Sequence, residues 1–204
     1  MVIGVTGNVA SGKSVAAGFL KEILGGTVVD ADALGRFLLE SHPDVRKMVR
    51  LEFGADVVDH FTDEIDRKKL SRFVFSSPDN LTRLNRIFYP YMIYEVRMAV
   101  LKAKKVFSHV ILDAALIVEW NFQSDLDCLV CVTARPEIRV RRLMENRRLL
   151  EDDAENMVSA QASEDFKASV SDFVIRNEGT LEELRAEAEK TAKEILEKEG
   201  AKEK

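Results

Sequence analysis

Short apolar runs alternate along the chain with longer segments of amphipathic, helical spacing. The apolar runs have the length and composition typical of buried strands, and there are five: Val2–Thr6, Thr27–Asp30, Val110–Asp113, Leu126–Val132 and Phe173–Ile175. Strands that alternate with helices indicate a parallel sheet covered by helices. The pattern therefore predicts an α/β fold.

Two of the helical segments have clear boundaries. The segment Lys13–Leu24 has one apolar face, and Gly25 and Gly26 follow it as a stop signal. Near the end of the chain, Thr180 and Glu183 have the spacing of a capping box. We expect this pair to begin a final helix with an apolar stripe of Leu181, Leu184, Ala188, Ile195 and Leu196.

Two stretches between the strands are too long for simple crossovers and show only helical patterns. In residues 33–105, Ser77 and Pro78 have the cap and first-turn pattern of a helix start, and Pro90 is expected to break or kink that helix. Residues 135–168 are expected to hold two helices. We therefore predict two helical insertions on a sheet core made of residues 1–32, 106–134 and 169–204.

The composition bounds the class of protein. The 204-residue chain is 46% hydrophobic and 32% charged, and its formal net charge of -5 argues against nucleic acid as a partner. No stretch approaches the roughly 18 apolar residues that a membrane-spanning helix needs, so no membrane partner is expected. The first residues do not have the pattern of a secretion signal. We expect a cytoplasmic protein, and we leave its oligomeric state open.

Cys128 and Cys131 have the C-x-x-C spacing of many metal and redox sites. They lie in an expected strand, however, where positions three apart point to opposite faces. The chain has no other cysteine that could complete a zinc site. We interpret both cysteines as core residues.

The strongest motif lies between the first expected strand and the first expected helix. Residues 7–14, GNVASGKS, match the phosphate-binding pattern G-x-x-x-x-G-K-[ST] in the strand–loop–helix context that this motif requires. Glycines let backbone N–H groups turn toward phosphates, and the helix N-terminus adds further donors. Lys13 is expected to reach the β- and γ-phosphates of ATP, and Ser14 to ligate Mg²⁺. A plain glycine turn would need neither side chain, so we predict a P-loop NTPase-type sheet.

Carboxylates follow two of the expected strands. Asp30 and Asp32 come after the second strand, at the sheet edge where ligands of open parallel sheets bind. Asp32 is the better placed to accept the proton of an acceptor hydroxyl, and the alternative is that it only caps the next helix. Asp113 ends the third strand and is either a magnesium-holding aspartate or an ordinary strand end.

Arginines are concentrated just after the fourth expected strand, where Arg135, Arg139 and Arg142 share one helix face. A mobile helical hairpin could bring one or two of them onto transferred phosphate. The alternative is a solvated basic face paired within the helix, for example Glu137 with Arg141.

Several separated stretches together resemble the dephospho-coenzyme A kinase family, from Val2 to about Gly179: IGVTGNVASGKS, VVDADALGR, IDRKKLSRFVF, LNRIFYP, ILDAALIVE, SAQ and DFVIRNEG. The resemblance implies a kinase that moves the γ-phosphate of ATP to the 3′-hydroxyl of dephospho-coenzyme A, the last step of coenzyme A synthesis. It also implies a P-loop core with a substrate-binding insertion at residues 33–105 and a lid at residues 135–168.

The resemblance also assigns roles to residues. Asp32 matches the proposed catalytic base and Arg142 a lid arginine, and we group both with Lys13 as catalytic. Arg67 is the favoured basic residue for the substrate's phosphates, and Tyr89 stands where the family usually has a histidine, whose role is lost or passes to Tyr89. Ala115 and Arg139 also depart from the family pattern. The expected nucleotide site comprises Gly7, Ala10, Ser11, Gly12, Lys13, Ser14, Val15 and Asn177.

Two other functions remain open at this point. The first is a P-loop kinase for another small hydroxylated or nucleotide substrate, since one fold serves many acceptors. The second is a nucleotide-dependent switch or binding protein, although the chain lacks the N-K-x-D stretch that generally reads guanine in GTPases.

Overall fold

A five-stranded parallel sheet forms the centre of the molecule in the computed structural model, which describes residues 1–59, 62, 64–161 and 163–202. The strands are β1 (Val2–Thr6), β2 (Thr27–Asp30), β3 (Val110–Asp113), β4 (Cys128–Thr133) and β5 (Phe173–Arg176), in the order β2-β3-β1-β4-β5. The predicted α/β fold is confirmed, and only β4 differs clearly from expectation, because it begins at Cys128 rather than Leu126. The strand order reverses direction at β1, so the loop after β1 lies at the point where such sheets bind ligands.

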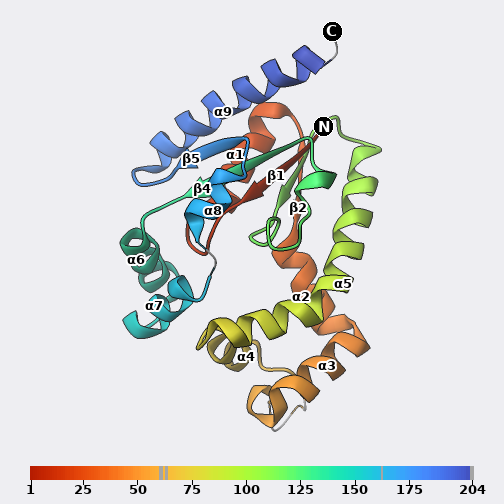
Figure 1. The fold of residues 1–204 in the computed structure, drawn as a ribbon, viewed down its shortest axis with the longest axis vertical. Helices are drawn as coiled ribbons and strands as arrows, with labels where there is room; N and C mark the ends of the chain where they lie inside the picture. Colours follow the sequence, from red (N-terminus) through yellow and green to blue (C-terminus); the bar gives the residue numbers. More distant parts are fainter. Residues whose placement is uncertain (60–61, 63, 162, 203–204) are drawn as a thin grey trace.

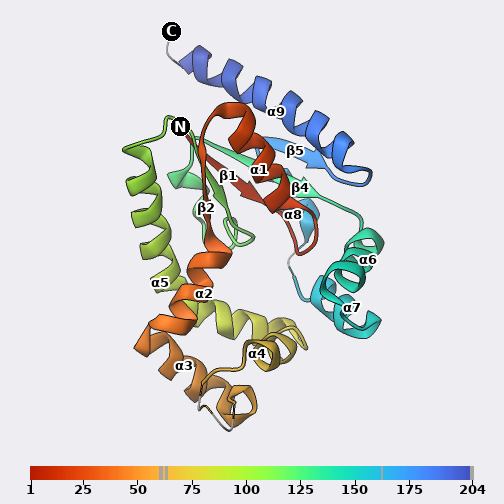
Figure 2. The ribbon, with the colours of Figure 1, turned by 180° about the vertical axis from the view of Figure 1, so that it is seen from behind.

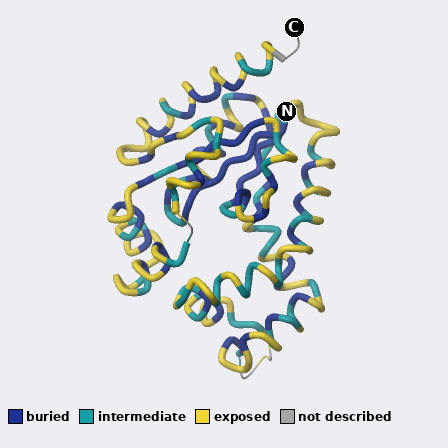
Figure 3. The backbone as a smooth tube through the Cα atoms, in the orientation of Figure 1, coloured by how far each residue is buried: buried dark blue, intermediate teal, exposed yellow. Residues whose placement is uncertain are grey.

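Helices cover both faces of the sheet (Figures 1 and 2). Helices α1 (Lys13–Leu24) and α9 (Leu181–Lys202) share one apolar cluster with Ile111 of β3. The neighbouring strand residues Val110 and Leu112 belong to the cluster of the other face, which includes α5 (Pro78–Lys104). Strand side chains alternate between faces, and both faces are covered, which is why these strands read as continuous apolar runs. Figure 3 shows the strands as the buried centre of the molecule.

The two cysteines follow the same alternation. Cys128 belongs to the cluster with α1 and α9, whereas Cys131 faces the opposite side, toward Lys167 of the short helix α8 (Glu164–Ser169). Both are buried, and neither sulfur is part of a disulfide. Burial raises the pKa of the Cys131 thiol to about 12, so it stays protonated and unreactive at neutral pH. The interpretation as core residues is confirmed.

The first insertion is helical, as predicted, with one isolated antiparallel bridge between Val58 and Ile65. Ser77 caps α5 by accepting the N–H of Asn80, and this helix continues through Pro90 rather than breaking there. It changes direction near its middle (Figure 1), which is the kink that an internal proline causes. The other helices of the insertion are α2 (Ala31–Ser41), α3 (Pro43–Phe53), η1 (Gly54–Val57) and α4 (Arg67–Val74).

In its described residues, the second insertion contains three helices rather than the expected two. Helices α6 (Pro136–Arg147) and α7 (Glu151–Ser159) form a hairpin with its own apolar cluster around Leu143 and Met157, while α8 packs against β4.

A short turn, η2 (Gln123–Asp125), precedes β4. Thr180 and Glu183 make the predicted capping box at the start of α9. Among the described residues, no helix is both long and apolar enough to cross a membrane.

Candidate active site

The loop between β1 and α1 adopts a conformation that only some residues allow. Gly12, at the N-cap of α1, has a φ of 93°, and Ala10 has a φ of 59°. A side chain at Gly7 would place its Cβ 2.4 Å from the carbonyl oxygen of Val132. Gly12 therefore allows a positive φ, and Gly7 allows the backbone of β4 to approach closely.

Lys13 connects the P-loop to the carboxylates that follow β2 and β3. Its Nζ lies 2.8 Å from Oδ1 of Asp113 and 3.7 Å from Oδ2 of Asp32. The register explains this meeting, because Asp113 pairs with Val5 on one side and with Asp30 on the other. Lys13 and Asp113 are buried, whereas the side chain of Asp32 is 62% exposed. Of the two carboxylates, Asp32 is therefore the one within reach of a soluble substrate.

Asp30 and Asp32 have different structural roles. Oδ1 of Asp30 accepts the N–H of Ala33 at 2.9 Å, so Asp30 is the N-cap of α2. Asp32 is the second residue of the helix, in its first turn, and is not the N-cap. This removes the capping alternative for Asp32 and leaves its carboxylate facing the cavity next to the P-loop.

That cavity, which we call the P-loop cavity, has a volume of about 410 Å³. The P-loop forms one wall with Gly12, Lys13 and Ser14, and Asp32 lies at another. Phe75, at the end of α4, and Arg147, at the end of α6, bring the two insertions to the same cavity. Chain segments from all parts of the molecule therefore meet around Lys13.

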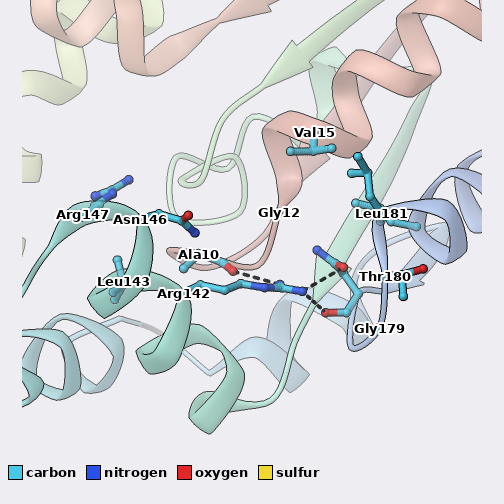
Figure 4. Close-up of a pocket in the computed structure, with 12 residues that line it drawn as sticks. Ala10, Gly12, Val15, Arg142, Leu143, Asn146, Arg147, Gly179, Thr180 and Leu181 are labelled. Carbon is cyan, nitrogen blue, oxygen red and sulfur yellow. Dashed lines mark hydrogen bonds between the residues drawn. The ribbon is translucent and has the colours of Figure 1, made fainter.

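A second cavity of about 350 Å³ lies on the α9 side of the loop, and we call it the Arg142 cavity (Figure 4). Val15, Leu143 and Leu181 give it apolar walls, and Asn177 and Thr180 supply polar edges. Apolar walls with a few polar groups suit a planar heterocyclic base.

Arg142 reaches from α6 to the P-loop and to the end of β5. Its Nη1 donates to the carbonyl oxygens of Ala10 and Ser11 at 3.2 and 3.4 Å, and its Nη2 donates to the carbonyl oxygen and Oδ1 of Asn177, both at 3.1 Å. Burial and the neighbouring Arg141 lower the pKa of the Arg142 guanidinium from its ordinary value. Through these four hydrogen bonds Arg142 links the α6–α7 hairpin to the P-loop and to Asn177. We call this set of contacts the Arg142 brace.

Asn177 strengthens this brace. Its Nδ2 donates to the carbonyl oxygen of Ser11 at 2.7 Å, and its own N–H donates to Thr133. Because a trans peptide is planar, holding the Ser11 carbonyl on one side sets the N–H of Gly12 on the other. Arg142 and Asn177 thus orient a backbone donor of the P-loop.

A third cavity, which we call the α4–α7 cleft, has a volume of about 810 Å³ and is lined by several basic side chains. It shares Phe75 and Arg147 with the P-loop cavity. Arg67 pairs with Glu40 at 3.3 Å, and Arg72 pairs loosely with Asp153 at 3.8 Å. Its basic lining residues are Arg67, Lys68, Arg72, Arg147 and Arg148.

Tyr89 is placed differently from the other expected site residues. Its side chain lies on α5 and is 45% exposed, and it is not among the residues that line these three cavities. Gly7 and Ser11 belong to the P-loop itself and are buried. The structure brings the remaining expected residues to the P-loop, to the Arg142 cavity or to the cleft.

The arginines after β4 have diverse environments. Arg135 pairs with Glu178, and Arg141 pairs with Glu145 rather than with Glu137. Arg139 is 5% exposed, so it is not part of a solvated face. Of the three that share the expected helix face, only Arg142 contacts the P-loop in the described part of the chain.

Sequence reasoning missed two residues. Gln161 is a neutral residue in the short stretch SAQ, whose only signal in the sequence was the family resemblance. In the structure its Oε1 accepts a hydrogen bond from the N–H of Val9. Lys167 is fully buried and donates to the carbonyl oxygen of Ala115 at 2.6 Å and to Glu119 at 2.9 Å. A lysine in a polar helix carries no signal of burial, because long charged side chains mostly lie at the surface.

Sequence comparison assigns the arrangement to a family. A sequence model described as dephospho-CoA kinase matches residues 1–183. The chain belongs to the dephospho-CoA kinase family. It is therefore a kinase of coenzyme A biosynthesis. The dephospho-CoA kinase of Clostridium tetani is 33% identical over 92% of this chain and 83% of its own length, and that of Arabidopsis thaliana is 36% identical over 95% and 83%.

Solved structures agree with this assignment. The crystal structure of TT1252 from Thermus thermophilus superposes with a TM-score of 0.73 at 30% identity, covering 96% of both chains. The similarity in fold extends over nearly the whole chain, insertions included. Membership of the dephospho-CoA kinase family implies the use of ATP.

Proposed function

We propose that the protein transfers the γ-phosphoryl group of ATP to the ribose 3′-hydroxyl of dephospho-coenzyme A. One observation carries this proposal: Lys13 and Asp32 meet in a cavity that lies between an apolar-walled cavity and a basic cleft. A nucleotide entering from one side and a phosphorylated acceptor entering from the other would meet at these two side chains.

The nucleotide would lie along the P-loop. Its base would occupy the Arg142 cavity against Val15 and Leu181, and its phosphates would accept hydrogen bonds from the backbone of residues 10–15. Lys13 would exchange part of its pairing with Asp32 for the β- and γ-phosphates. Arg142 and Asn177 would act by holding the loop in shape, because their polar groups already bind its carbonyl oxygens.

The residues at the end of β3 fit a magnesium ion. Mg²⁺ usually takes one or two carboxylates, the substrate phosphates and several waters, so a dedicated cluster of protein ligands is not required. Asp113 supplies a buried carboxylate and Ser14 a hydroxyl at the mouth of the P-loop cavity. We propose these two as the metal-holding residues, and the ion would neutralise charge on the phosphates when bound.

Asp32 would orient the acceptor hydroxyl and accept its proton. Its carboxylate is exposed to the cavity and lies 3.7 Å from Nζ of Lys13. Asp32 would then lie beside the transferred γ-phosphate, where it could position the acceptor for phosphoryl transfer.

The acceptor's remaining phosphates would bind in the α4–α7 cleft. Arg67 and Arg72 come from the insertion and Arg147 from the end of α6, so an anionic ligand there would draw the two insertions together. We propose the corresponding three-part division, with residues 33–105 as the substrate-binding part and residues 135–168 as a lid. Because α8 packs on the core, the α6–α7 hairpin would be the moving portion.

The proposal includes a cytoplasmic location and small-molecule partners only. It is tested by coupled ADP release with ATP, Mg²⁺ and dephospho-coenzyme A, run beside a panel of nucleosides, nucleotides and sugar acids. ADP release that depends on dephospho-coenzyme A, with coenzyme A as the product, supports it. Turnover with another acceptor alone would assign a different substrate. Bound ATP with no turnover on any acceptor would favour a switch or binding protein.

A further inference from the structure

Gln161 lies between α7 and α8, in the segment through which the α6–α7 hairpin returns to the core. Its side-chain Oε1 accepts a hydrogen bond from the backbone N–H of Val9 at 2.6 Å, although 152 residues separate the two. Val9 is part of the P-loop. Gln161 also lines the P-loop cavity together with Lys13 and Asp32. One neutral side chain thus contacts both the loop and the cavity that the loop forms.

The peptide between Asn8 and Val9 is held on both sides. The carbonyl oxygen of Asn8 accepts the N–H of Ser11 at 3.1 Å, and the N–H of Val9 donates to Gln161. The C=O and N–H of a trans peptide point in opposite directions within one plane, so two such bonds set its rotation. Without Gln161 only the bond to the Asn8 carbonyl remains, so the direction of the Val9 N–H is less firmly fixed.

Both legs of the hairpin reach this part of the loop. On the outgoing leg, Arg142 holds the carbonyl oxygens of Ala10 and Ser11. Between the legs, the apolar cluster of the hairpin packs against Val9 and Ala10. On the returning leg Gln161 holds the N–H of Val9, directly before α8, which Lys167 fixes to the core through the carbonyl oxygen of Ala115.

We propose that Gln161 is a positioning residue that couples the α6–α7 hairpin to the P-loop by setting the orientation of the Asn8–Val9 peptide. The shape of the loop around the nucleotide phosphates then depends on the position of the hairpin. The inference rests on the proposed nucleotide site, but not on the identity of the acceptor. Gln161 acts through Val9 and transfers no proton.

The first test replaces the side chain by one of similar length that cannot accept the bond. Gln161→Met is expected to raise the Kd for ATP–Mg²⁺, measured by calorimetry without acceptor, about five- to tenfold, the effect of one lost hydrogen bond. Amide hydrogen exchange at Val9 should become faster in the same variant. Gln123→Met is the matched control, because Gln123 hydrogen-bonds Asn121 within its own loop. It should change neither quantity.

The second test uses pH. Gln161→Glu keeps an oxygen for Val9 but adds a negative charge beside the phosphates, and a protonated carboxyl has nearly the shape and bonding of the original amide. A glutamate ordinarily titrates at about pH 4.3, so the ratio of variant to wild-type ATP affinity should rise as the pH falls from about 7 to about 4. A glutamate remote from the phosphates would give a ratio that does not depend on pH.

Unchanged ATP affinity and Val9 exchange in Gln161→Met would overturn the inference, as would a ratio for Gln161→Glu that does not vary with pH. A lower melting temperature that accounts for the whole loss of binding would also overturn it. Failure of the wild-type protein to phosphorylate dephospho-coenzyme A would refute the proposed acceptor, while the ATP measurements would still decide the role of Gln161.

Discussion

The proposed nucleotide side and the proposed acceptor side of the site are built in different ways. Around the P-loop, polar groups are bound to protein partners: the buried Lys13 to Asp113 at 2.8 Å, and the half-buried Arg142 to four oxygens. In the α4–α7 cleft, the side chains of Arg67 and Arg72 are 52% and 78% exposed, and their ion pairs are longer, at 3.3 and 3.8 Å. One side is preorganised, and the other is composed of adaptable surface charges.

This difference teaches where each side obtains its binding energy. Preorganised donors cost no further ordering when phosphates arrive, so they contribute strongly to transition-state stabilisation. Exposed arginines lose rotamer freedom and are screened by salt, so each contributes little alone. Substitutions on the two sides should therefore differ in size and in which kinetic constant they change.

The largest effect is expected at the boundary between the two sides. Asp32→Asn keeps the size of the side chain but removes the proton acceptor, so kcat should fall about 10²- to 10⁴-fold. ATP affinity, measured by calorimetry, should change far less, because Asp32 is mostly exposed and is not a P-loop residue. Equal turnover in the variant would remove Asp32 from the role of base.

A substitution within the brace should have the next largest effect. Arg142→Lys retains the charge but cannot reach four oxygens at once, so kcat/KM for ATP should fall about 10- to 100-fold. The KM for the acceptor should change little. Arg141→Lys is the matched control, since Arg141 is exposed and its Nε lies 3.9 Å from Glu145. A similar loss in both variants would contradict a special role for Arg142.

On the acceptor side, single substitutions should have smaller effects. Arg67→Ala is expected to raise the KM for dephospho-coenzyme A about three- to tenfold without changing that for ATP, and the difference should shrink at high salt. Arg83→Ala provides the comparison, because Arg83 belongs to the same insertion but pairs with Glu52 away from the cleft. Steady-state kinetics at two salt concentrations measure this. An effect of Arg67→Ala on ATP alone would refute the assigned side.

The smallest effect concerns stability rather than activity. Burial raises the pKa of Glu164 from its ordinary 4.5, against the opposing influence of Arg139 and the N–H of Ala134. The charged form is therefore disfavoured in the folded state, and stability falls as the pH rises from about 4.5 through the folded pKa. Glu164→Gln removes this cost and should raise the melting temperature at neutral pH by roughly 1–3 °C.

The higher melting temperature of Glu164→Gln should disappear at acidic pH, where the wild-type carboxyl is protonated and as neutral as the amide. Thermal melts at acidic and neutral pH distinguish this from a general gain in packing, which would persist at every pH. A lower melting temperature at neutral pH would show that the attraction between Glu164 and Arg139 outweighs the cost of burial.

Local patterns predicted most of the fold because they report local physics. Three local patterns predicted the backbone conformation that the structure has. They are the apolar run of β1, the glycines on either side of α1 and the capping box of Thr180. Pro90 was harder, since packing of α5 maintains the helix where the proline alone favours a break. Helix α8 was missed because six residues carry too little periodicity to be recognised.

By itself the sequence determined the P-loop, the parallel sheet and the expectation that Lys13, Ser14, Asp32 and Asp113 belong to one site. Those residues follow strand ends, and parallel strands bring their carboxyl ends to one edge of the sheet. Only the tertiary structure decided that Asp30, not Asp32, caps α2, and that Arg142 and Gln161 hold the P-loop from two legs of one hairpin. The contacts of Arg142 and Gln161 join residues more than 100 positions apart, and no local spacing encodes the direction in which a helix returns to the sheet.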